Sequence, residues 1–515
     1  MEKESVAVVD IGTNTFHLLI TEVNSEGEFY VKHKFKEMVK LGEGGIDTDV
    51  ITDASFQRGI NALKVFSQYI EQHRCNCVIA FATSAIRTAK NGSDFIQKVY
   101  EQTGMEIKVI NGNEEAALIY EGVKNGIQLS PQEPVLIIDI GGGSVEFIVA
   151  NSLHPLLLRS LKLGASRIYE TFKPFDPITP QQITLIENYY LQELKALIEE
   201  VKEFKINKII GTSGAFETIA TMIAYQNGDY LTASGNINGY RFFAEQFSNV
   251  YAQLLNSNRE QRLQMQGMDK QRVDLIVVAA ILIACVQKQL NINQFIVSNY
   301  ALKDGIFYTY LGKKVHGIGA SSASDKTLRE KSVHNLFKKF HCNEKHTDKV
   351  IQLVLSLFEQ TKELHGYGDL EKELLTYSAL LHDVGYYIHR SGHHKHGQYI
   401  IMNSQLPGFS NDELLLIGNI VRYHRKSLPS KDHPYFNVLT TEHKNMVKKL
   451  AAFLRIADHL DKGHRGLVKD LKIECFPQVV NIQVISDTDV TPELEAANKE
   501  KVLFEDAFKV KLVIS

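Results

Sequence analysis

The feature that most constrains this chain is a strand, glycine turn and strand motif that occurs twice, 129 positions apart. The first copy runs from Val6 to Ile20 (VAVVDIGTNTFHLLI) and the second from Val135 to Ala150 (VLIIDIGGGSVEFIVA). In both copies a run of β-branched and aliphatic residues ends at an aspartate, and a second apolar run follows the turn. Such internal repetition predicts two related halves that face one cleft, each supplying one β-hairpin loop.

The turn of the second copy has the chemistry of a phosphate-binding loop. Gly141, Gly142 and Gly143 lack Cβ atoms, so the N–H groups of the turn can close on a phosphate. Asp139 and Glu146 flank this turn, and carboxylates beside phosphates usually hold Mg²⁺. An ordinary glycine-rich hairpin would explain one such segment alone equally well. The repetition favours the phosphate loop.

The composition fits a chain of several folded domains. The 515 residues are 44% hydrophobic and 23% charged, with a formal net charge of −3. About three or four globular domains of ordinary size are therefore expected. The near-neutral charge gives no support for binding nucleic acid through charge. The five cysteines are odd in number and scattered, which favours a reducing cytoplasm over a disulfide framework.

The sequence pattern offers no membrane or targeting segment. The first predicted strand reaches Asp10, which leaves no room for a signal peptide before it. The longest apolar run, Leu275 to Val286, is about a dozen residues and too short to span a bilayer. A buried helix is expected there.

The first half, residues 1–127, is predicted to be an α/β lobe. After the hairpin, Phe29 to Val39 is expected to form a third strand, and Thr52 to Gln72 has helical spacing with Thr52 as its N-cap. Cys77 to Ala82 is a short strand, and ligands of open α/β sheets bind beyond the carboxyl ends of strands. Arg87 therefore has two interpretations: a cation for phosphate oxygens, or a surface salt bridge.

Two adjacent acids, Glu114 and Glu115, follow the predicted strand Ile107 to Ile110 and open a helical run. Acids in the first turn of a helix are favoured by the helix dipole, which would make both structural. A carboxylate at the mouth of the cleft could instead take a proton from a water as a general base. The residues themselves leave both interpretations open.

The second half, residues 128–312, repeats this organisation. Helical spacing from Gln182 to Phe204 predicts a long amphipathic helix. The strand Ile206 to Ile210 leads into Gly211 and Gly214, whose N–H groups at a strand-to-helix junction can face an anion.

The composition changes after the second half. Residues 317–325 (GIGASSASD) are small and polar and are expected to form a linker. From 326 to 469 the periodicity is helical throughout and histidine is dense. From 470 to 515, two alternating strands, Ile473 to Val484 and Phe508 to Ile514, are expected to enclose a charged helix, Thr491 to Val502, as a small α+β unit.

Taken together, segments along the chain resemble the exopolyphosphatase and guanosine pentaphosphate phosphohydrolase (Ppx/GppA) family. In family order they are DIGTNTFHLLI, NGNEEAALIYEGV, DIGGGSVEF, GTSGAFETIA and LHDVGYYIHRSGHHKHGQYI with RYHRK. The resemblance covers nearly the whole chain. It implies an α/β, bilobal, duplicated actin-like (ribonuclease H-like) phosphatase fold for residues 1–312, then an all-α HD-type domain and the small C-terminal α+β unit.

The resemblance also implies roles for individual residues. Glu115 resembles the catalytic base of the family, and Asp139 and Glu146 resemble the carboxylates that hold Mg²⁺ and position the water. Arg87 matches an arginine of the family. The residues that resemble its phosphate-binding loops are Gly12, Thr13, Asn14, Gly142, Gly143 and Ser144.

One segment departs from the family pattern. Where the family has an acidic residue and glycine, followed by Arg-Glu-Gly, this chain has Asn299-Tyr300 and Lys303-Asp304-Gly305. Lys303 keeps the charge but lacks the bidentate fork of an arginine, which puts a substrate contact there in doubt.

The histidine-rich segment resembles the HD phosphohydrolase pattern, which combines imidazoles and aspartates around one or two metal ions. The matching residues are His346, His382, Asp383, His396, His424 and Asp458. His393 or His394 could replace His396, because GHHKHG offers three imidazoles. In the other interpretation this domain only shapes a dimer surface and a basic channel for polyphosphate, lined by His389, Arg390, Lys395, Arg422, Arg425 and Lys426.

The resulting hypothesis is a Mg²⁺-dependent hydrolase that releases the terminal phosphate of inorganic polyphosphate or guanosine pentaphosphate, with water activated by Glu115. Two alternatives stay open: an HD-type metallophosphohydrolase whose actin-like lobes sense phosphate or nucleotide, and a non-catalytic binder of guanosine polyphosphates or polyphosphate. Intact Glu115, Asp139 and Glu146 favour the hydrolase. A transition metal in the HD-type domain, a homodimer and a cytoplasmic location are also expected, with no nucleic-acid or membrane partner.

Overall fold

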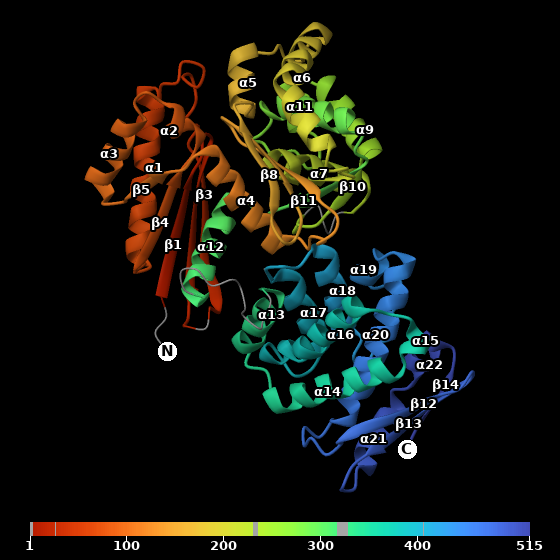
Figure 1. The fold of residues 1–515 in the computed structure, drawn as a ribbon. Helices are drawn as coiled ribbons and strands as arrows, with labels where there is room; N and C mark the ends of the chain where they lie inside the picture. Colours follow the sequence, from red (N-terminus) through yellow and green to blue (C-terminus); the bar gives the residue numbers. More distant parts are fainter. Residues whose placement is uncertain (1–3, 26, 230–234, 317–327, 405) are drawn as a thin grey trace. The chain divides into compact units, whose positions relative to one another are not determined.

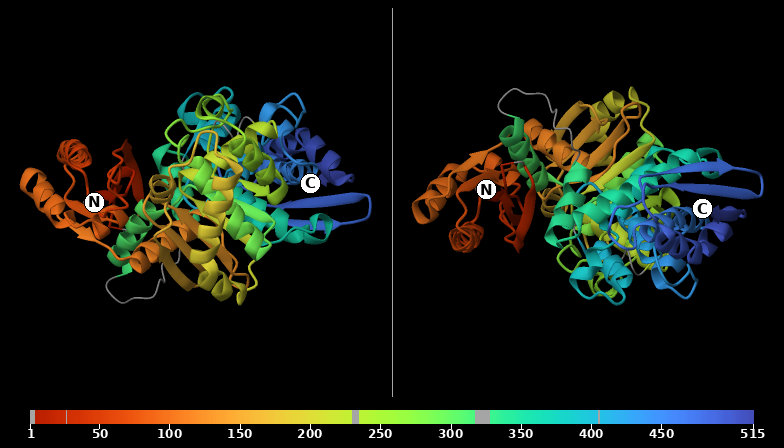
Figure 2. Two further views of the ribbon diagram at one scale, coloured as in Figure 1. Left: turned by 90° about the horizontal axis from the view of Figure 1, so that it is seen from above. Right: turned by 90° about the horizontal axis from the view of Figure 1, so that it is seen from below.

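The chain folds into two compact units, Met1–Asp325 and Lys326–Ser515 (Figures 1 and 2). The computed structural model describes residues 4–25, 27–229, 235–316, 328–404 and 406–515. The expected linker at 317–325 lies outside the described residues.

The first unit opens with a five-stranded sheet in the order β3-β2-β1-β4-β5. Its strands are β1 (Glu4–Ile11), β2 (Thr15–Val23), β3 (Phe29–Met38), β4 (Cys77–Ala82) and β5 (Ile107–Val109). β1 and β2 form the predicted antiparallel hairpin, with Asp10 opposite His17. β4 pairs with β1 in parallel, so the turn after β1 and the segment after β4 lie at the same edge of the sheet.

Helices pack on this first sheet and close its core. They are α1 (Asp53–Gln72), α2 (Ser84–Thr88) and α3 (Gly92–Thr103). α1 begins where its sequence predicts, because the Thr52 side chain accepts a hydrogen bond from the N–H of Ser55. Its apolar residues, among them Leu63 and Phe66, join the buried side chains of β1 and β2 in one hydrophobic cluster.

A six-stranded sheet in the order β10-β11-β9-β6-β7-β8 forms the second lobe of this unit. Its strands are β6 (Val135–Ile140), β7 (Val145–Ala150), β8 (Pro155–Leu161), β9 (Lys208–Thr212), β10 (Arg241–Phe243) and β11 (Gln294–Ser298). β6 and β7 form the second hairpin, with Asp139 opposite Glu146. β9 lies parallel to β6, as β4 does to β1, so the predicted duplication is confirmed.

One helix that is buried over most of its length organises the second lobe. Its helices are α5 (Ala165–Phe172), α6 (Pro180–Lys202), α7 (Gly214–Gln226), α9 (Ala244–Leu255), α10 (Arg259–Leu263) and α11 (Ile276–Leu290). α11 is buried from Ile276 to Val286, and the Tyr190 hydroxyl of α6 donates to the Val278 carbonyl at 3.2 Å. In the described part of the chain, no helix combines the length and the apolar composition needed to cross a membrane.

Two helices bridge the lobes: α4 (Gly112–Gly126) and α12 (Leu302–His316). α12 follows the second lobe in sequence but packs against α4 and β1 of the first (Figure 1). A Cβ on Gly305 would lie 1.7 Å from the Leu118 carbonyl oxygen, and one on Gly122 would lie 2.3 Å from that of Ala301. Glycine is therefore required where these helices cross, because their backbones are in contact.

The second unit is helical from Leu328 to Leu460 in its described elements, as the periodicity predicts. They are α13 (Leu328–Lys339), α14 (Glu344–Gln360), α15 (Lys362–His365), α16 (Asp369–Leu381), the 3₁₀ helix η1 (Val384–Tyr387), α17 (His393–Asn403), α18 (Asn411–Arg422), α19 (Pro434–Asn437) and α20 (Thr441–Leu460).

The C-terminal segment forms a three-stranded sheet, not the predicted pair of strands. Its elements are β12 (Asp470–Cys475), β13 (Val479–Ile485), α21 (Thr491–Lys499), α22 (Val502–Phe508) and β14 (Lys511–Ile514). The prediction of a single strand over Ile473 to Val484 is wrong. The Phe476 N–H donates to the Val479 carbonyl in a tight turn around Pro477, and this turn separates β12 from β13. This sheet shares one hydrophobic core with the helices of the second unit.

Candidate active site

The two hairpin turns of the first unit line one cavity of about 160 Å³. The predicted loop residues all border it: Gly12, Thr13, Asn14, Gly142, Gly143 and Ser144. A Cβ on Gly142 would lie 2.9 Å from the Asn14 side chain, and one on Gly143 would lie 2.6 Å from Ser84 Oγ. The loops therefore meet at distances that only glycine allows.

The two turns also share one backbone geometry. The N–H of Gly12 donates to the Thr15 carbonyl at 3.2 Å, and that of Gly141 donates to the Ser144 carbonyl at 3.0 Å. Asn14 ties the lobes together, because its Oδ1 accepts a hydrogen bond from Ser166 Oγ at 2.8 Å. The repeated sequence thus produces two equivalent loops on opposite walls of the cavity.

The adjacent acids at the start of α4 have different environments. Glu114 is exposed and completes a capping box, accepting a hydrogen bond from the Asn111 N–H at 2.9 Å. Glu115 is buried and lines the cavity. Glu114 therefore has the structural role of capping the helix, and Glu115 has the position that a general base requires.

Acidic side chains dominate the cavity. Among the described residues its lining includes Asp10, Glu115, Asp139, Glu146 and Glu217. Burial, and then the nearby Glu115 carboxylate, raise the pKa of Asp10 and of Asp139 to about 7. The same two causes raise the pKa of Glu146 well above its usual range. Glu146 also accepts a hydrogen bond from Ser160 Oγ at 2.7 Å.

Arg87 acts on this cavity through Glu115. Its Nη1 donates to Glu115 Oε2 and to the Ile110 carbonyl, each at 2.9 Å. Arg87 is not among the residues that line the cavity, and its connection to the cavity is the ion pair with Glu115. The direct phosphate contact expected from the sequence stays a prediction. Burial raises the pKa of Glu115, and Arg87 opposes that rise.

Among the described residues, three other lysine or arginine side chains line the cavity. The sequence patterns assigned no role to two of them and left a substrate contact of the third, Lys303, in doubt. They are Lys36 of β3, Arg272 before α11, and Lys303 at the start of α12. The Nε of Arg272 is buried without a hydrogen-bond partner. Lys303 pairs with Asp304 at 3.0 Å, and burial, which lowers the pKa of Lys303, is outweighed by Asp304. These side chains can neutralise several negative charges at once.

The glycines around β9 and α7 have separate functions. Ser213 and Gly214 line the cavity at the N-terminus of α7, where N–H groups can face an anion. Gly211 is required by packing, because a Cβ there would lie 2.0 Å from the Phe216 ring. Of the two glycines predicted to face an anion, Gly214 lines the cavity and Gly211 does not.

The cavity has the donor chemistry of a magnesium site. Asp139 and Glu146 face each other across the second hairpin, and carboxylate oxygens are the ligands that Mg²⁺ prefers. Because burial and then the nearby Glu115 carboxylate raise the pKa of both acids, a bound cation would favour their ionised forms. The residues present therefore fit a divalent cation.

Comparison with known proteins identifies the group to which this arrangement belongs. Residues 19–314 match the Ppx/GppA phosphatase family, and residues 328–500 match Ppx/GppA phosphatase, domain III. The chain belongs to the Ppx/GppA phosphatase family. The first unit accordingly has the actin-like fold of the Ppx/GppA family, built on mixed α/β sheets.

Two relatives and two solved structures show how far the similarity extends. Guanosine-5'-triphosphate,3'-diphosphate pyrophosphatase of Pseudoalteromonas atlantica is 26% identical over 460 residues, which is 88% of this chain and 86% of the relative. The enzyme of that name from Pseudoalteromonas translucida is 26% identical over 493 residues, 94% and 93% of the two chains. An exopolyphosphatase structure from Cytophaga hutchinsonii is 34% identical, with a TM-score of 0.57, and covers 60% of this chain and 98% of its own. The Ppx/GppA family member from Aquifex aeolicus, 24% identical with a TM-score of 0.51 over 61% of this chain and 100% of its own, shares the fold.

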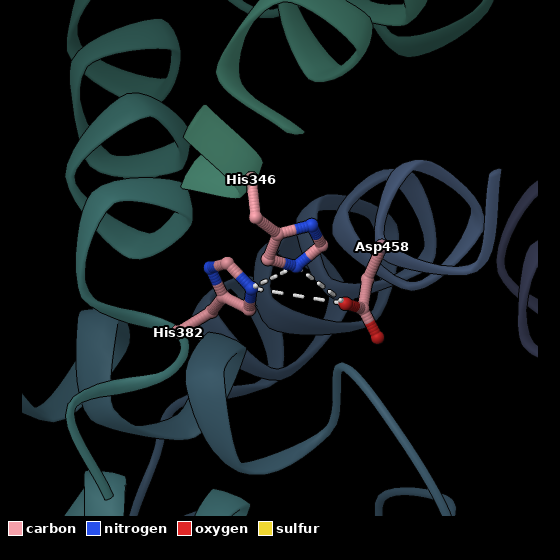
Figure 3. A group of neighbouring side chains, drawn as sticks. All are labelled: His346, His382 and Asp458. Atoms are coloured by element: carbon pink, nitrogen blue, oxygen red, sulfur yellow. Dashed lines mark hydrogen bonds and ion pairs between the residues drawn. The ribbon is translucent and has the colours of Figure 1, made fainter. Parts of the chain in front are cut away.

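The part of this Ppx/GppA chain that matches domain III holds a second group of convergent side chains. His346 of α14, His382 after α16 and Asp458 of α20 point toward one another (Figure 3). Asp383, His393 and His424 form an adjoining group. Five of the six residues predicted from the HD-type pattern are thus brought together.

His396 is the exception. The position predicted for it is taken by His393, the first residue of α17, whose Nε2 lies 3.1 Å from that of His424. Tyr386 of η1 stacks on the His393 ring with centroids 4.1 Å apart, which fixes the ring in the cluster. His396 lies one helical turn later and is only partly buried. Which of the neighbouring histidines joins the cluster is determined by the residue at which α17 begins.

Proposed function

We propose that this Ppx/GppA family member hydrolyses the terminal phosphoanhydride bond of inorganic polyphosphate or guanosine pentaphosphate in the cavity between its two hairpin turns. The observation that carries the proposal is the position of Glu115, a buried carboxylate on the same cavity as both glycine loops. The names of the relatives, guanosine-5'-triphosphate,3'-diphosphate pyrophosphatase and exopolyphosphatase, support this reaction class.

In this proposal the substrate binds by its anionic end. The N–H groups of the two loops and of the α7 N-terminus hold the terminal phosphate. Lys36, Arg272 and Lys303 neutralise the negative charge of the remaining phosphates. Phosphoryl transfer needs little covalent assistance, so positioning and charge stabilisation can supply most of the rate acceleration.

Glu115 is proposed as the general base. A water attacks the terminal phosphorus in line, its proton passes to Glu115, and the bond to the bridging oxygen breaks. Burial raises the pKa of Glu115, which makes its carboxylate a stronger base than an exposed one. Arg87 is a positioning residue, because its hydrogen bond fixes the direction of Glu115 Oε2 and opposes protonation.

Asp139 and Glu146 are proposed to hold Mg²⁺, with Asp10 on the opposite loop close enough for its pKa to respond to Asp139. A bound Mg²⁺ would neutralise charge that develops on the phosphoryl oxygens. The relatives' names support both substrates, and both present the same terminal group to the loops. A homodimer in the cytoplasm belongs to the same proposal.

The experiment uses the two adjacent glutamates as a matched pair. Phosphate release from polyphosphate and from guanosine pentaphosphate is measured for the wild type, Glu115→Gln and Glu114→Gln, with and without Mg²⁺. Loss of the general base should lower kcat by about 10²–10⁴-fold and leave substrate binding intact. Glu114→Gln should stay within a few-fold of wild type, because Glu114 caps α4 and pairs with the exposed Lys108 outside the cavity.

Two outcomes would contradict the proposal. Turnover of Glu115→Gln at the wild-type rate would remove Glu115 as the base. Activity that survives in Glu115→Gln but disappears in His393→Ala would place the reaction in the second unit. The first unit would then be left as a sensor of phosphate or nucleotide.

A further inference from the structure

The histidine cluster of the second unit is a second site, separate from the cavity. We define it as His346, His382, Asp383, His393, His424 and Asp458. The side chains of its four histidines are at most 1% exposed, whereas those of Asp383 and Asp458 are 9% and 16% exposed. The carboxylates therefore form the accessible side of a buried imidazole group.

The protonation of the four rings follows from their neighbours. Nδ1 of His382 lies 2.7 Å from the Ala379 carbonyl, and Nδ1 of His424 lies 2.6 Å from that of Val421. Because a carbonyl only accepts, each Nδ1 must carry the proton, which leaves a lone pair on Nε2 of a neutral ring.

The other two rings follow the same rule. Nδ1 of His346 lies 2.8 Å from Asp461 Oδ2. Nδ1 of His393 lies 3.1 Å from the Arg390 carbonyl, closer than the 3.5 Å to Arg425 Nη1. A histidine whose Nδ1–H donates to a carboxylate or carbonyl and whose Nε2 is free is the usual form of a metal ligand.

These Nε2 atoms face one another. Those of His346 and His382 are 3.2 Å apart, and those of His393 and His424 are 3.1 Å apart. When both rings of a pair are neutral and protonated at Nδ1, neither has a proton to place between these Nε2 atoms, and both Nε2 atoms can bind a metal ion. Ligand atoms that bind one metal ion at about 2.0–2.2 Å are about 3.0–3.6 Å from one another, which the pairs match.

A core histidine of the same unit provides the contrast. His365 is also buried, but its Nε2 contacts the Phe358 carbonyl at 2.8 Å and its Nδ1 accepts from the Tyr367 N–H at 2.9 Å. Both of its nitrogens are satisfied by backbone. The cluster differs because its Nε2 atoms have only each other and the carboxylates.

From this geometry we infer that the histidine cluster binds two divalent transition-metal ions bridged by Asp383. The first site is formed by His346 and His382 with Asp458 Oδ1, at 3.3 and 3.7 Å from the two Nε2 atoms. Asp383 Oδ2 faces the same site, 3.5 Å from His382 Nε2.

The second site uses the other oxygen of the bridge. Asp383 Oδ1 lies 3.4 Å from His393 Nε2, and His424 completes the set. Three protein ligands leave coordination positions for water or an anion.

The donor atoms determine the class of metal. Imidazole nitrogen with carboxylate oxygen favours Mn²⁺, Fe²⁺, Co²⁺ or Zn²⁺ over Mg²⁺, which prefers oxygen alone. Paired ions with open positions are a common arrangement for binding phosphate esters in phosphatases and nucleases. Arg425, whose Nη1 lies 3.5 Å from His393 Nδ1, adds positive charge near the second site, which suits an anionic ligand of that class.

Metal content of the full chain tests the inference. Protein stripped with a chelator is dialysed against Mn²⁺ or Zn²⁺ with excess Mg²⁺, which occupies the carboxylate site of the first unit, then passed over a desalting column and analysed by mass spectrometry for bound transition metal. We expect about two ions per chain in the wild type and about one in His393→Ala, which removes only a ligand of the second site. The matched control is His396→Ala, one turn along α17, which should retain about two.

A second pair of measurements keeps the inference falsifiable if a variant folds poorly. Wild-type protein should show a higher melting temperature with Mn²⁺ or Zn²⁺, since the ions bind the folded chain. Glu146→Gln should keep both ions, because its carboxylate lies in the first unit. A wild type with less than a tenth of an ion per chain and no thermal shift would overturn the inference. So would equal loss in His393→Ala and His396→Ala, or loss confined to Glu146→Gln.

Discussion

The cavity of the first unit and the histidine cluster of the second both bury aspartates, yet their neighbours shift those acids in opposite directions. In the cavity, burial and adjacent carboxylates raise the pKa of Asp10 and Asp139 to about 7. In the cluster, burial raises the pKa of Asp458, but the hydrogen bond with His346 and the surrounding imidazoles outweigh it and hold that pKa well below its usual range. Burial alone therefore does not determine the state of an aspartate. The surrounding donors determine it, and they also decide whether a site suits Mg²⁺ or a transition metal.

Selective removal of metal should give the largest effect. EDTA should lower phosphate release at least about 100-fold, and Mg²⁺ alone should restore it, because charge stabilisation in the cavity depends on an oxygen-bound cation. Metal analysis of the same sample checks that the cluster is still free of transition metal. Activity that returns only with Mn²⁺ or Zn²⁺ would indicate that hydrolysis takes place in the second unit and not in the cavity of the first.

The pair formed by Arg87 and Glu115 should give the next largest effect. Arg87→Ala should reduce kcat by about 10–100-fold, because the general base loses its orientation. Arg87 opposes the raised pKa of Glu115, so its removal raises that pKa further. A base works only when ionised, and the acidic limb of the pH profile of kcat/KM should therefore move to higher pH. Arg87→Lys should recover part of the shift, whereas an unchanged limb would exclude this role.

The raised pKa of Asp139 should make Mg²⁺ binding dependent on pH. Mg²⁺ binds the ionised carboxylate and must displace its proton. If one proton is displaced, the Mg²⁺ affinity should rise about tenfold per pH unit below pH 7, and it should level off above pH 7. Calorimetric titration in buffers of different ionisation enthalpy measures the proton release. A slope that persists in Asp139→Asn would assign the proton to another group.

The same pKa shift has a consequence for stability. The folded-state pKa of Asp139 is raised to about 7 from the usual 3.8. Protonation of Asp139 therefore stabilises the folded state. This stabilisation is fully present when the pH is below the usual pKa of 3.8, and it is lost as the pH rises toward 7. Without metal, the first unit should become less resistant to denaturant over that interval, and saturating Mg²⁺ should reduce the loss.

The crossing of α4 and α12 should give the smallest effect, on stability. Gly305→Ala should cost about 1–3 kcal/mol, because the backbones must separate to accept a methyl group. The matched control is Gly312→Ala on the same helix, where an added Cβ meets nothing within 4 Å. That change should be neutral or stabilise by up to about 1 kcal/mol. Denaturant titration of both variants measures the difference, and equal effects would show that the close approach is relaxed in solution.

Local signals in the sequence predicted much of the fold. The two hairpins follow from alternation and glycine, and the start of α1 follows from Thr52, whose side chain caps it. The helical run expected to open at Glu114 and Glu115 begins at Gly112, where the Asn111 side chain caps α4. Cap and turn signals act over a few residues, so the sequence alone can reveal them. The alternating pattern continues on both sides of Pro477 and so predicts one strand, where the chain forms the hairpin of β12 and β13.

The cations of the candidate site could not be predicted in the same way. Lys36 lies on a largely exposed strand, and Arg272 stands alone before an apolar helix. Both reach the cavity only through long-range packing. The choice of His393 over His396 likewise depends on the first residue of α17, and helix boundaries are the least certain part of a sequence interpretation.

The return of α12 to the first lobe has a mechanical consequence. The polypeptide passes between the lobes twice, between α4 and β6 and again between β11 and α12. Two covalent passages hinder sliding and twisting of one lobe against the other, and leave rotation about a line through both passages as the easiest large motion. Opening and closing of the cavity would be such a rotation, and the close contact of α4 and α12 at Gly122 and Gly305 would then stay in place while the lobes turn.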